Sequence, residues 1–145
     1  MLSLKIDSLQ YFEILNLSNG CYYPVKKFMN KNDIENVILN YKYKNKFFPI
    51  PIFFNVSENK INKIEKEKSF NLIYNRKKVG IFYISDIFKL DKKKYIKKYF
   101  GTNSKRHTGV KNFIILKNYF ISGIVELNKK LKFPNSFKPI YWRSE

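Results

Sequence analysis

Two apolar runs joined by a short polar turn constrain the fold of this chain more than any other segment. SFNLIY at 69–74 and KKVGIFYISDIF at 77–88 are rich in β-branched and aromatic residues, and they meet at Asn75-Arg76-Lys77. This spacing predicts an antiparallel hairpin with Gly80 at a bulge or bend. Two further apolar runs, FIILK and YFISGIVEL, are separated by little more than Lys117-Asn118 and predict a second hairpin.

Prolines mark a different kind of strand in FFPIPIFFNV at 47–56. Pro49 and Pro51 each remove a backbone donor and forbid a helix, yet their neighbours are bulky and apolar. The segment therefore predicts an edge strand, or a strand that is entered through its prolines.

Three segments carry helix signals. Asp7 can cap a helix that begins near Ser8 and stops at Asn19-Gly20. In NKNDIENVILNY at 30–41, Asn30 or Asn32 can cap a second helix, because apolar residues recur there at i, i+3, i+4 and i+7. Asp91 is predicted to cap a third, basic helix in DKKKYIKKYF, whereas SENKINKIEKEK at 57–68 is interpreted only as a charged connection.

These elements predict the fold class. About five or six short strands with three helices and small turns indicate an α+β domain in which antiparallel pairing dominates. The length of 145 residues fits one domain. We expect this domain to span residues 1–136, with residues 137–145 forming a C-terminal tail or the start of a linker.

The formal net charge of +18 would ordinarily indicate a polyanionic partner. However, the chain contains no alanine, and residues with A/T-rich codons dominate its composition. Its basic residues are almost all lysine, whereas bidentate recognition of phosphates and bases favours arginine. Codon bias in the genome is therefore the explanation of the charge that we favour over a specific nucleic-acid site.

The cysteine count and the hydropathy pattern limit which disulfides, metal sites and membrane segments the chain can have. Cys21 is the single cysteine, so no intrachain disulfide is possible, and we interpret it as a small buried thiol. No Cys/His cluster offers metal ligands, and no apolar run approaches the roughly 20 residues that span a bilayer. We therefore expect a soluble, unprocessed cytoplasmic protein that needs no metal, no cofactor and no membrane.

The stretch FGTNSKRHTGV at 100–110 contains the only histidine of the chain. One hypothesis is an enzyme that uses His107 with Arg106 on an anionic substrate such as a phosphate or sulfate ester. The other is a structural turn, because Gly101 and Gly109 permit unusual backbone angles and the polar residues between them can form local hydrogen bonds. No phosphate-binding glycine motif or H-E-x-x-H occurs elsewhere, and we assign no catalytic residue.

The basic segment KKKYIKK also has two interpretations. Tyr95 and Tyr99 could stack on bases beside lysine–phosphate contacts. Alternatively, they face inward on an amphipathic helix whose lysines are solvated, which is the interpretation we favour. The lysines that could contact an anion or nucleic acid are Lys26, Lys27, Lys92, Lys93, Lys94, Lys97 and Lys98.

Four collinear segments, within roughly 14–127, resemble the N-terminal PUA-like domain of the ATP sulfurylases (sulfate adenylyltransferases). NGCYYPVKKFM is similar to N-G-x-F/Y-S-P-L-T-G-F-M, although Lys26-Lys27 replaces Thr-Gly. PIPIFFNV resembles W-P-I-P-I-T-L-x-V, and SGIVEL resembles G-G-P-I/V-E-L. FGTNSKRHTGV is similar to Y-G-T-T-D-x-x-H-P-G-V, with matches at Gly101, Thr102, His107, Gly109 and Val110.

The resemblance implies a PUA-like mixed β pseudo-barrel with short helices. In that family the chemistry belongs to a following α/β domain, whose Q-x-R-N-x-x-H-x-x-H and G-R-D-type motifs are missing here. The chain stops about where the family would enter that domain, so we expect it not to be catalytic alone.

Two functions follow from the resemblance. The first is a stand-alone or split PUA-like module that docks on a separate sulfurylase-type catalytic domain or protein in sulfate activation. Apolar residues of the tail would then anchor the interface, namely Phe137, Ile140, Tyr141 and Trp142. The alternative is an RNA-binding PUA-like module that uses a basic surface, and the sequence leaves the oligomeric state open.

Overall fold

The computed structural model describes residues 2–101, 104, 106–114 and 118–128. Its helices are α1 (Ser8–Ser18), α2 (Lys31–Asn40), α3 (Glu58–Ile64), α4 (Lys92–Phe100) and α5 (Thr108–Ile114). Its strands are β1 (Ser3–Lys5), β2 (Lys42–Tyr43), β3 (Lys46–Phe47), β4 (Phe54–Val56), β5 (Ser69–Tyr74), β6 (Lys77–Lys89) and β7 (Tyr119–Leu127). The predicted α+β class is confirmed.

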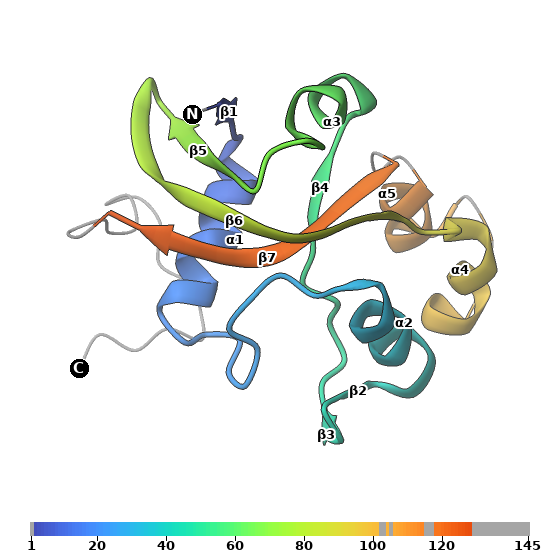
Figure 1. The fold of residues 1–145 in the computed structure, drawn as a ribbon. Coiled ribbons are helices and arrows are strands. Elements are labelled where there is room, and N and C mark those ends of the chain that lie inside the picture. Colours follow the sequence, from blue (N-terminus) through green and yellow to red (C-terminus); the bar gives the residue numbers. More distant parts are fainter. Residues whose placement is uncertain (1, 102–103, 105, 115–117, 129–145) are drawn as a thin grey trace.

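A five-stranded sheet in the order β1-β5-β6-β7-β4 organises the molecule. The long strands β6 and β7 cross its centre, with α1 behind them in the view of Figure 1. Pairing is antiparallel except between β1 and β5, which are parallel. A separate small hairpin, β2–β3, lies at the opposite end of the molecule from α3 (Figure 1).

The hairpin predicted at residues 69–88 is confirmed. Asn75 and Arg76 both have positive φ angles, which suits a two-residue turn between twisted strands. The register shifts where Leu72 pairs with Gly80 and Ile73 pairs with Lys78, so the bulge lies beside Gly80 as predicted.

The proline-rich segment forms less strand than its length suggests. Only Phe54–Val56 pairs as β4, at the edge of the sheet against β7. The residues directly before it, 48–53, belong to no strand, because the two prolines supply no donors for a ladder. The expectation of an edge strand entered through its prolines is confirmed.

The helix signals in the sequence mark the helix ends well. Asp7 forms a capping box with Gln10, and Asn30 caps α2 by accepting a hydrogen bond from the Asp33 amide. Asp91 occupies the N-cap of α4 but makes no side-chain hydrogen bond there. The charged segment at 57–68, interpreted from the sequence only as a connection, contains the helix α3. Its two buried residues, Ile61 and Ile64, are too few to form a periodic pattern that predicts a helix.

The second predicted hairpin is wrong in its first strand. Phe113 and Ile114 of FIILK belong to α5, and residues 115–117 lie outside the described part. A short apolar run does not distinguish a strand from a buried helix by periodicity alone. Instead, β7 pairs with β4 and with β6, and the helices α4 and α5 lie between β6 and β7 in the sequence.

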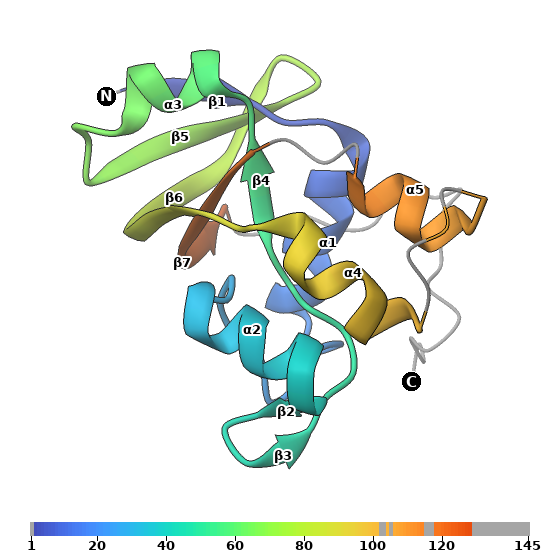
Figure 2. The ribbon, with the colours of Figure 1, turned by 90° about the vertical axis from the view of Figure 1, so that its right-hand side faces the viewer.

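A cluster of phenylalanines lies at the centre of the hydrophobic core. Phe28, Phe54, Phe70 and Phe82 are fully buried, and the Phe82 ring lies 5.0 Å from that of Phe54 and 5.1 Å from that of Phe70. These rings come from a loop and three strands, so their contact joins segments that are distant in the chain. Beside the sheet, α4 packs between α2 and α5 (Figure 2).

Candidate functional site

The stretch at residues 100–110 links two helices. Gly101 ends α4 in a left-handed conformation, and its amide donates to the Lys97 carbonyl at 2.9 Å. At the start of α5, the His107 carbonyl accepts from the Lys111 amide at 2.9 Å. Nδ1 of His107 accepts from the amides of Gly109 and Val110 at 3.1 and 3.3 Å. His107 thus occupies the N-cap of α5, where its ring nitrogen replaces the usual side-chain oxygen.

Packing around Gly109 reinforces this local role. A Cβ at Gly109 would lie 2.7 Å from the Phe100 ring and 3.0 Å from Cε1 of His107. The rings of Phe100 and His107 are themselves 5.5 Å apart. Arg106 is exposed, and Thr102 lies outside the described residues. The hydrogen bonds of His107 therefore support the structural interpretation of this stretch.

The second family-like segment, at residues 19–29, is tied to α1 by a polar network. The Tyr22 hydroxyl donates to Glu13 Oε1 at 2.9 Å and accepts from Asn16 Nδ2 at 3.2 Å. Burial raises the pKa of the Glu13 carboxyl, and the Tyr22 hydrogen bond opposes that shift. Nearby, burial also raises the pKa of the Cys21 thiol. That favours the protonated and less reactive form of Cys21.

The same segment joins the sheet at Phe28. The Phe28 amide donates to the Gly123 carbonyl at 3.0 Å, and the Gly123 amide returns a longer bond of 3.4 Å. A Cβ at Gly123 would lie only 2.1 Å from the Tyr83 carbonyl oxygen on the neighbouring strand. Glycine is therefore required here, because three backbone segments meet at this position.

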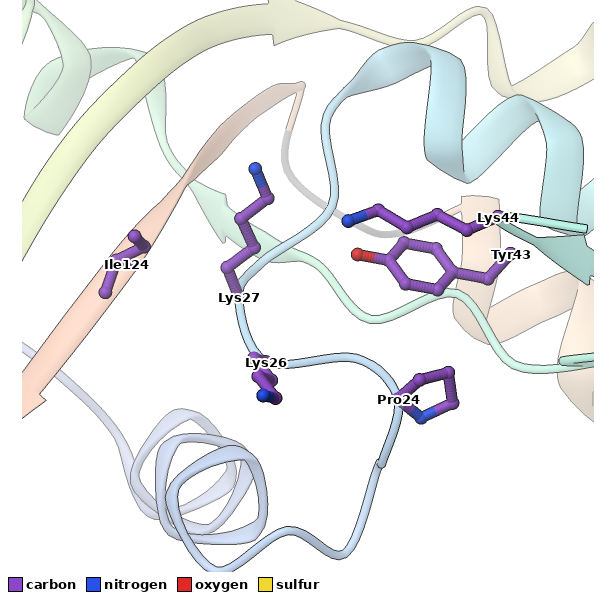
Figure 3. A pocket seen from close by; sticks show the side chains of 6 residues that line it. All are labelled: Pro24, Lys26, Lys27, Tyr43, Lys44 and Ile124. Atoms are coloured by element: carbon purple, nitrogen blue, oxygen red, sulfur yellow. The ribbon is translucent and has the colours of Figure 1, made fainter. Parts of the chain in front are cut away.

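The loop between these anchors forms one wall of a small pocket. Its volume is about 220 Å³, and its lining residues are Pro24, Lys26, Lys27, Tyr43, Lys44 and Ile124. Three segments distant in sequence supply them, and Figure 3 shows the Tyr43 hydroxyl directed toward the space between the lysines. Two of the predicted lysines, Lys26 and Lys27, are thus brought together with a third, Lys44.

Sequence reasoning missed Lys44 and Tyr43, although a signal for them exists. Lys44 and Asn45 both have positive φ angles and form the two-residue turn of the β2–β3 hairpin. The run Tyr43-Lys44-Asn45-Lys46 could have predicted that turn, because asparagine tolerates this conformation. Nothing local, however, places the turn beside Lys26 and Lys27.

The remaining predicted lysines form a separate surface on α4. Lys93, Lys94, Lys97 and Lys98 are exposed, whereas Lys92 is half-buried and burial lowers its pKa. None of them lines the pocket. Tyr95 and Ile96 are buried, and the half-buried Tyr99 donates its hydroxyl proton to the Pro49 carbonyl at 2.7 Å. The predicted amphipathic orientation of this helix is confirmed, which leaves Tyr95 unable to stack on a base.

Within the described residues, no group of three or more His, Cys, Asp or Glu side chains is arranged to hold a metal ion. The helices in that part of the chain are all too short or too polar to cross a bilayer.

Comparison with known proteins identifies the family to which the chain belongs. Residues 1–130 match the family model of the PUA-like domain. The sulfate adenylyltransferase of Ignicoccus hospitalis is 27% identical over 85% of this chain, and that of Entamoeba histolytica is 28% identical over 98%. The matched regions make up only 32% and 35% of those two enzymes.

Solved structures agree on the architecture. The hexameric APS kinase from Thiobacillus denitrificans superposes with a TM-score of 0.65, at 18% identity, over 93% of this chain and 23% of its own. That likeness concerns the fold alone. The predicted resemblance to the PUA-like domain of sulfate adenylyltransferases is confirmed by the relatives and by the family model. This chain therefore belongs to the PUA-like domain family.

Proposed function

We infer that this chain is a PUA-like module that docks on a separate sulfurylase-type catalytic polypeptide in sulfate activation and is not catalytic alone. One observation is the main support for this proposal. Nearly the whole chain aligns with sulfate adenylyltransferases, whereas it corresponds to only about a third of each enzyme, 32% and 35% in the two named above. In those relatives the matching region is part of a larger enzyme, so the partner proposed here would replace the remainder.

Exposed apolar side chains near the β2–β3 hairpin support a docking role. The Phe47 side chain is 76% exposed and that of Ile50 is 53% exposed. Leu39 and Tyr41, at the end of α2, are exposed in the same part of the sequence. Large apolar groups left in water near one another are typical of surfaces that a partner covers. The tail residues Phe137, Ile140, Tyr141 and Trp142 lie outside the described residues and stay predicted interface anchors, as does the domain boundary at residue 136.

Co-purification tests the proposal. The tagged chain would be co-expressed with the sulfurylase-type catalytic polypeptide of the same genome, and the complex measured by size-exclusion chromatography with light scattering. We expect a stable complex that Phe47→Asp and Ile50→Asp weaken about tenfold or more, because a charge in the centre of an apolar interface is desolvated without a partner.

Leu9→Asp is the matched control. Leu9 is 74% exposed on α1, away from the hairpin (Figure 1), so this substitution adds the same charge elsewhere. A genome that encodes no such polypeptide, or a chain that remains alone beside it, would overturn the proposal. Equal weakening by all three variants would reject the hairpin surface as the interface.

RNA binding is the second candidate function. The row of exposed lysines on α4 favours it, since clustered cations gain from releasing condensed counterions. The burial of Tyr95 removes one stacking contact that sequence-tolerant binders of single strands use. We therefore rank it below the docking module.

A further inference from the structure

The pocket between the loop at residues 24–27, the β2–β3 hairpin and β7 is the strongest unassigned feature of the molecule. Its six lining residues include three lysines. No acidic side chain in the described part of the chain pairs with Lys26, Lys27 or Lys44. Three lysine side chains that line one small pocket concentrate positive charge there, and a bound anion would offset that charge.

Tyr43 adds a hydroxyl donor to the wall of the pocket. Its side chain is 2% exposed, and its hydroxyl makes no hydrogen bond to any residue that the structure describes. Figure 3 shows this hydroxyl directed into the pocket, beside the Lys44 side chain. The Lys44 ammonium lies 5.4 Å from the centre of the Tyr43 ring. The hydroxyl does not belong to the buried polar atoms that lack a partner, so it is open to the pocket and free to donate to a bound group there.

Size and charge narrow the class of ligand. The volume of about 220 Å³ is below the roughly 300–1,000 Å³ of pockets that enclose drug-sized molecules, so a compact group fits better than a whole nucleotide. One carboxylate carries a single charge and would leave two of the three ammonium groups uncompensated. A phosphoryl group carries about two negative charges and three acceptor oxygens. Lysine also binds phosphate well as a point charge.

From this arrangement we propose that Lys26, Lys27, Lys44 and the Tyr43 hydroxyl form a binding site for a phosphoryl group, free or at the end of a larger molecule. Pro24 and Ile124 supply apolar walls beside it. The site goes beyond the docking function and does not depend on it, because no residue of the proposed apolar interface lines the pocket.

Calorimetric titration of the full chain with inorganic phosphate and pyrophosphate, at low and constant ionic strength, tests the site. We expect saturable binding that Lys27→Gln with Lys44→Gln weakens about tenfold or more, because each removes a charged donor. Tyr43→Phe removes only the hydroxyl and should weaken binding several-fold while leaving the melting temperature nearly unchanged. The control pair, Lys93→Gln with Lys97→Gln, removes the same charge from α4 and should leave binding intact.

Further titrations identify the source of the phosphoryl group. A 5′-phosphorylated RNA oligonucleotide that binds more tightly than its unphosphorylated form, in a Tyr43-dependent way, would assign the site to a terminal phosphate on nucleic acid. Binding of inorganic phosphate or pyrophosphate without that difference would assign it to a small metabolite. Either result supports the site.

Three results would overturn it. The first is equal loss of affinity in the α4 control pair, which would mean only general attraction of anions. The second is a Tyr43→Phe variant that binds like the parent protein. The third is saturable, lysine-dependent binding of a glutamate-rich peptide in the absence of phosphate binding, which would assign the pocket to carboxylates.

Discussion

His107 illustrates how a rare residue can serve a local structural purpose. Its Nδ1 accepts hydrogen bonds from the amides of Gly109 and Val110, so the ring acts as a helix cap. A histidine in this role is easily mistaken for a catalytic base, because both roles place a polar ring in a glycine-containing loop. The hydrogen-bond partners distinguish them.

Replacing His107 therefore tests the capping role. We expect His107→Ala to lower the free energy of unfolding by about 1 kcal/mol, whereas His107→Asn should retain most of the stability because its amide oxygen can accept the same bonds. Urea denaturation of both variants measures the difference. If the asparagine variant is as unstable as the alanine variant, the ring contributes through its contact with Phe100 and not through the cap.

At the scale of elements, the meeting of β6, β7 and the loop at Phe28 depends on Gly123. Its φ angle is +157°, and its Cα faces the Tyr83 carbonyl of β6. The Phe28 loop pairs with the same residue. A side chain here would separate strands whose contact positions one wall of the pocket at Ile124.

We expect Gly123→Ala to destabilise the protein by at least about 2 kcal/mol, through backbone strain and the clash with Tyr83. Gly20→Ala is the matched control, since Gly20 has a positive φ of +77° but nothing within 4 Å of its added Cβ. That control should cost only about 1–2 kcal/mol, the intrinsic penalty of the left-handed region. Thermal or chemical unfolding of the pair isolates the steric contribution, and equal losses would contradict it.

Also at the scale of elements, the sequence predicts helix ends and turns better than it predicts whether a short apolar run forms a strand or a helix. Asp7, Asn30 and the Asn75-Arg76 turn are recognised because each satisfies backbone groups within a few residues. The first two residues of FIILK, Phe113 and Ile114, were wrongly assigned to a strand, because a short apolar run fits either a strand or a helix turn. Which one forms depends on α4, against which α5 packs.

At the scale of the whole molecule, the charge of +18 is spread over several surfaces. Four exposed lysines occupy α4, and others such as Lys31, Lys42, Lys46 and Lys63 lie on α2, β2, β3 and α3. This distribution agrees with the codon-bias interpretation, in which lysines accumulate wherever they are tolerated.

We therefore expect weak RNA binding that falls steeply with salt and depends equally on both sets of lysines. Two variants compare the surfaces: one replaces the α4 lysines Lys93, Lys94, Lys97 and Lys98 with glutamine, and the other replaces Lys31, Lys42, Lys46 and Lys63. Both variants should reduce the slope of log association constant against log salt concentration by the same amount. Fluorescence anisotropy with a single-stranded RNA at several salt concentrations measures both. A reduction confined to the α4 set, about 0.7 for each lost phosphate contact, would instead favour the RNA-binding function.

The sequence alone determined the fold class, the main helix boundaries, the long hairpin and the family, because these depend on caps, prolines, turn residues and motifs read along the chain. The shared pocket, by contrast, exists only in the folded chain, where it is lined by Lys26, Lys27, Tyr43, Lys44 and Ile124 among others. Their contact depends on the β2–β3 turn and on the close approach at Gly123. Both arise from packing between segments distant in sequence, which no local pattern encodes.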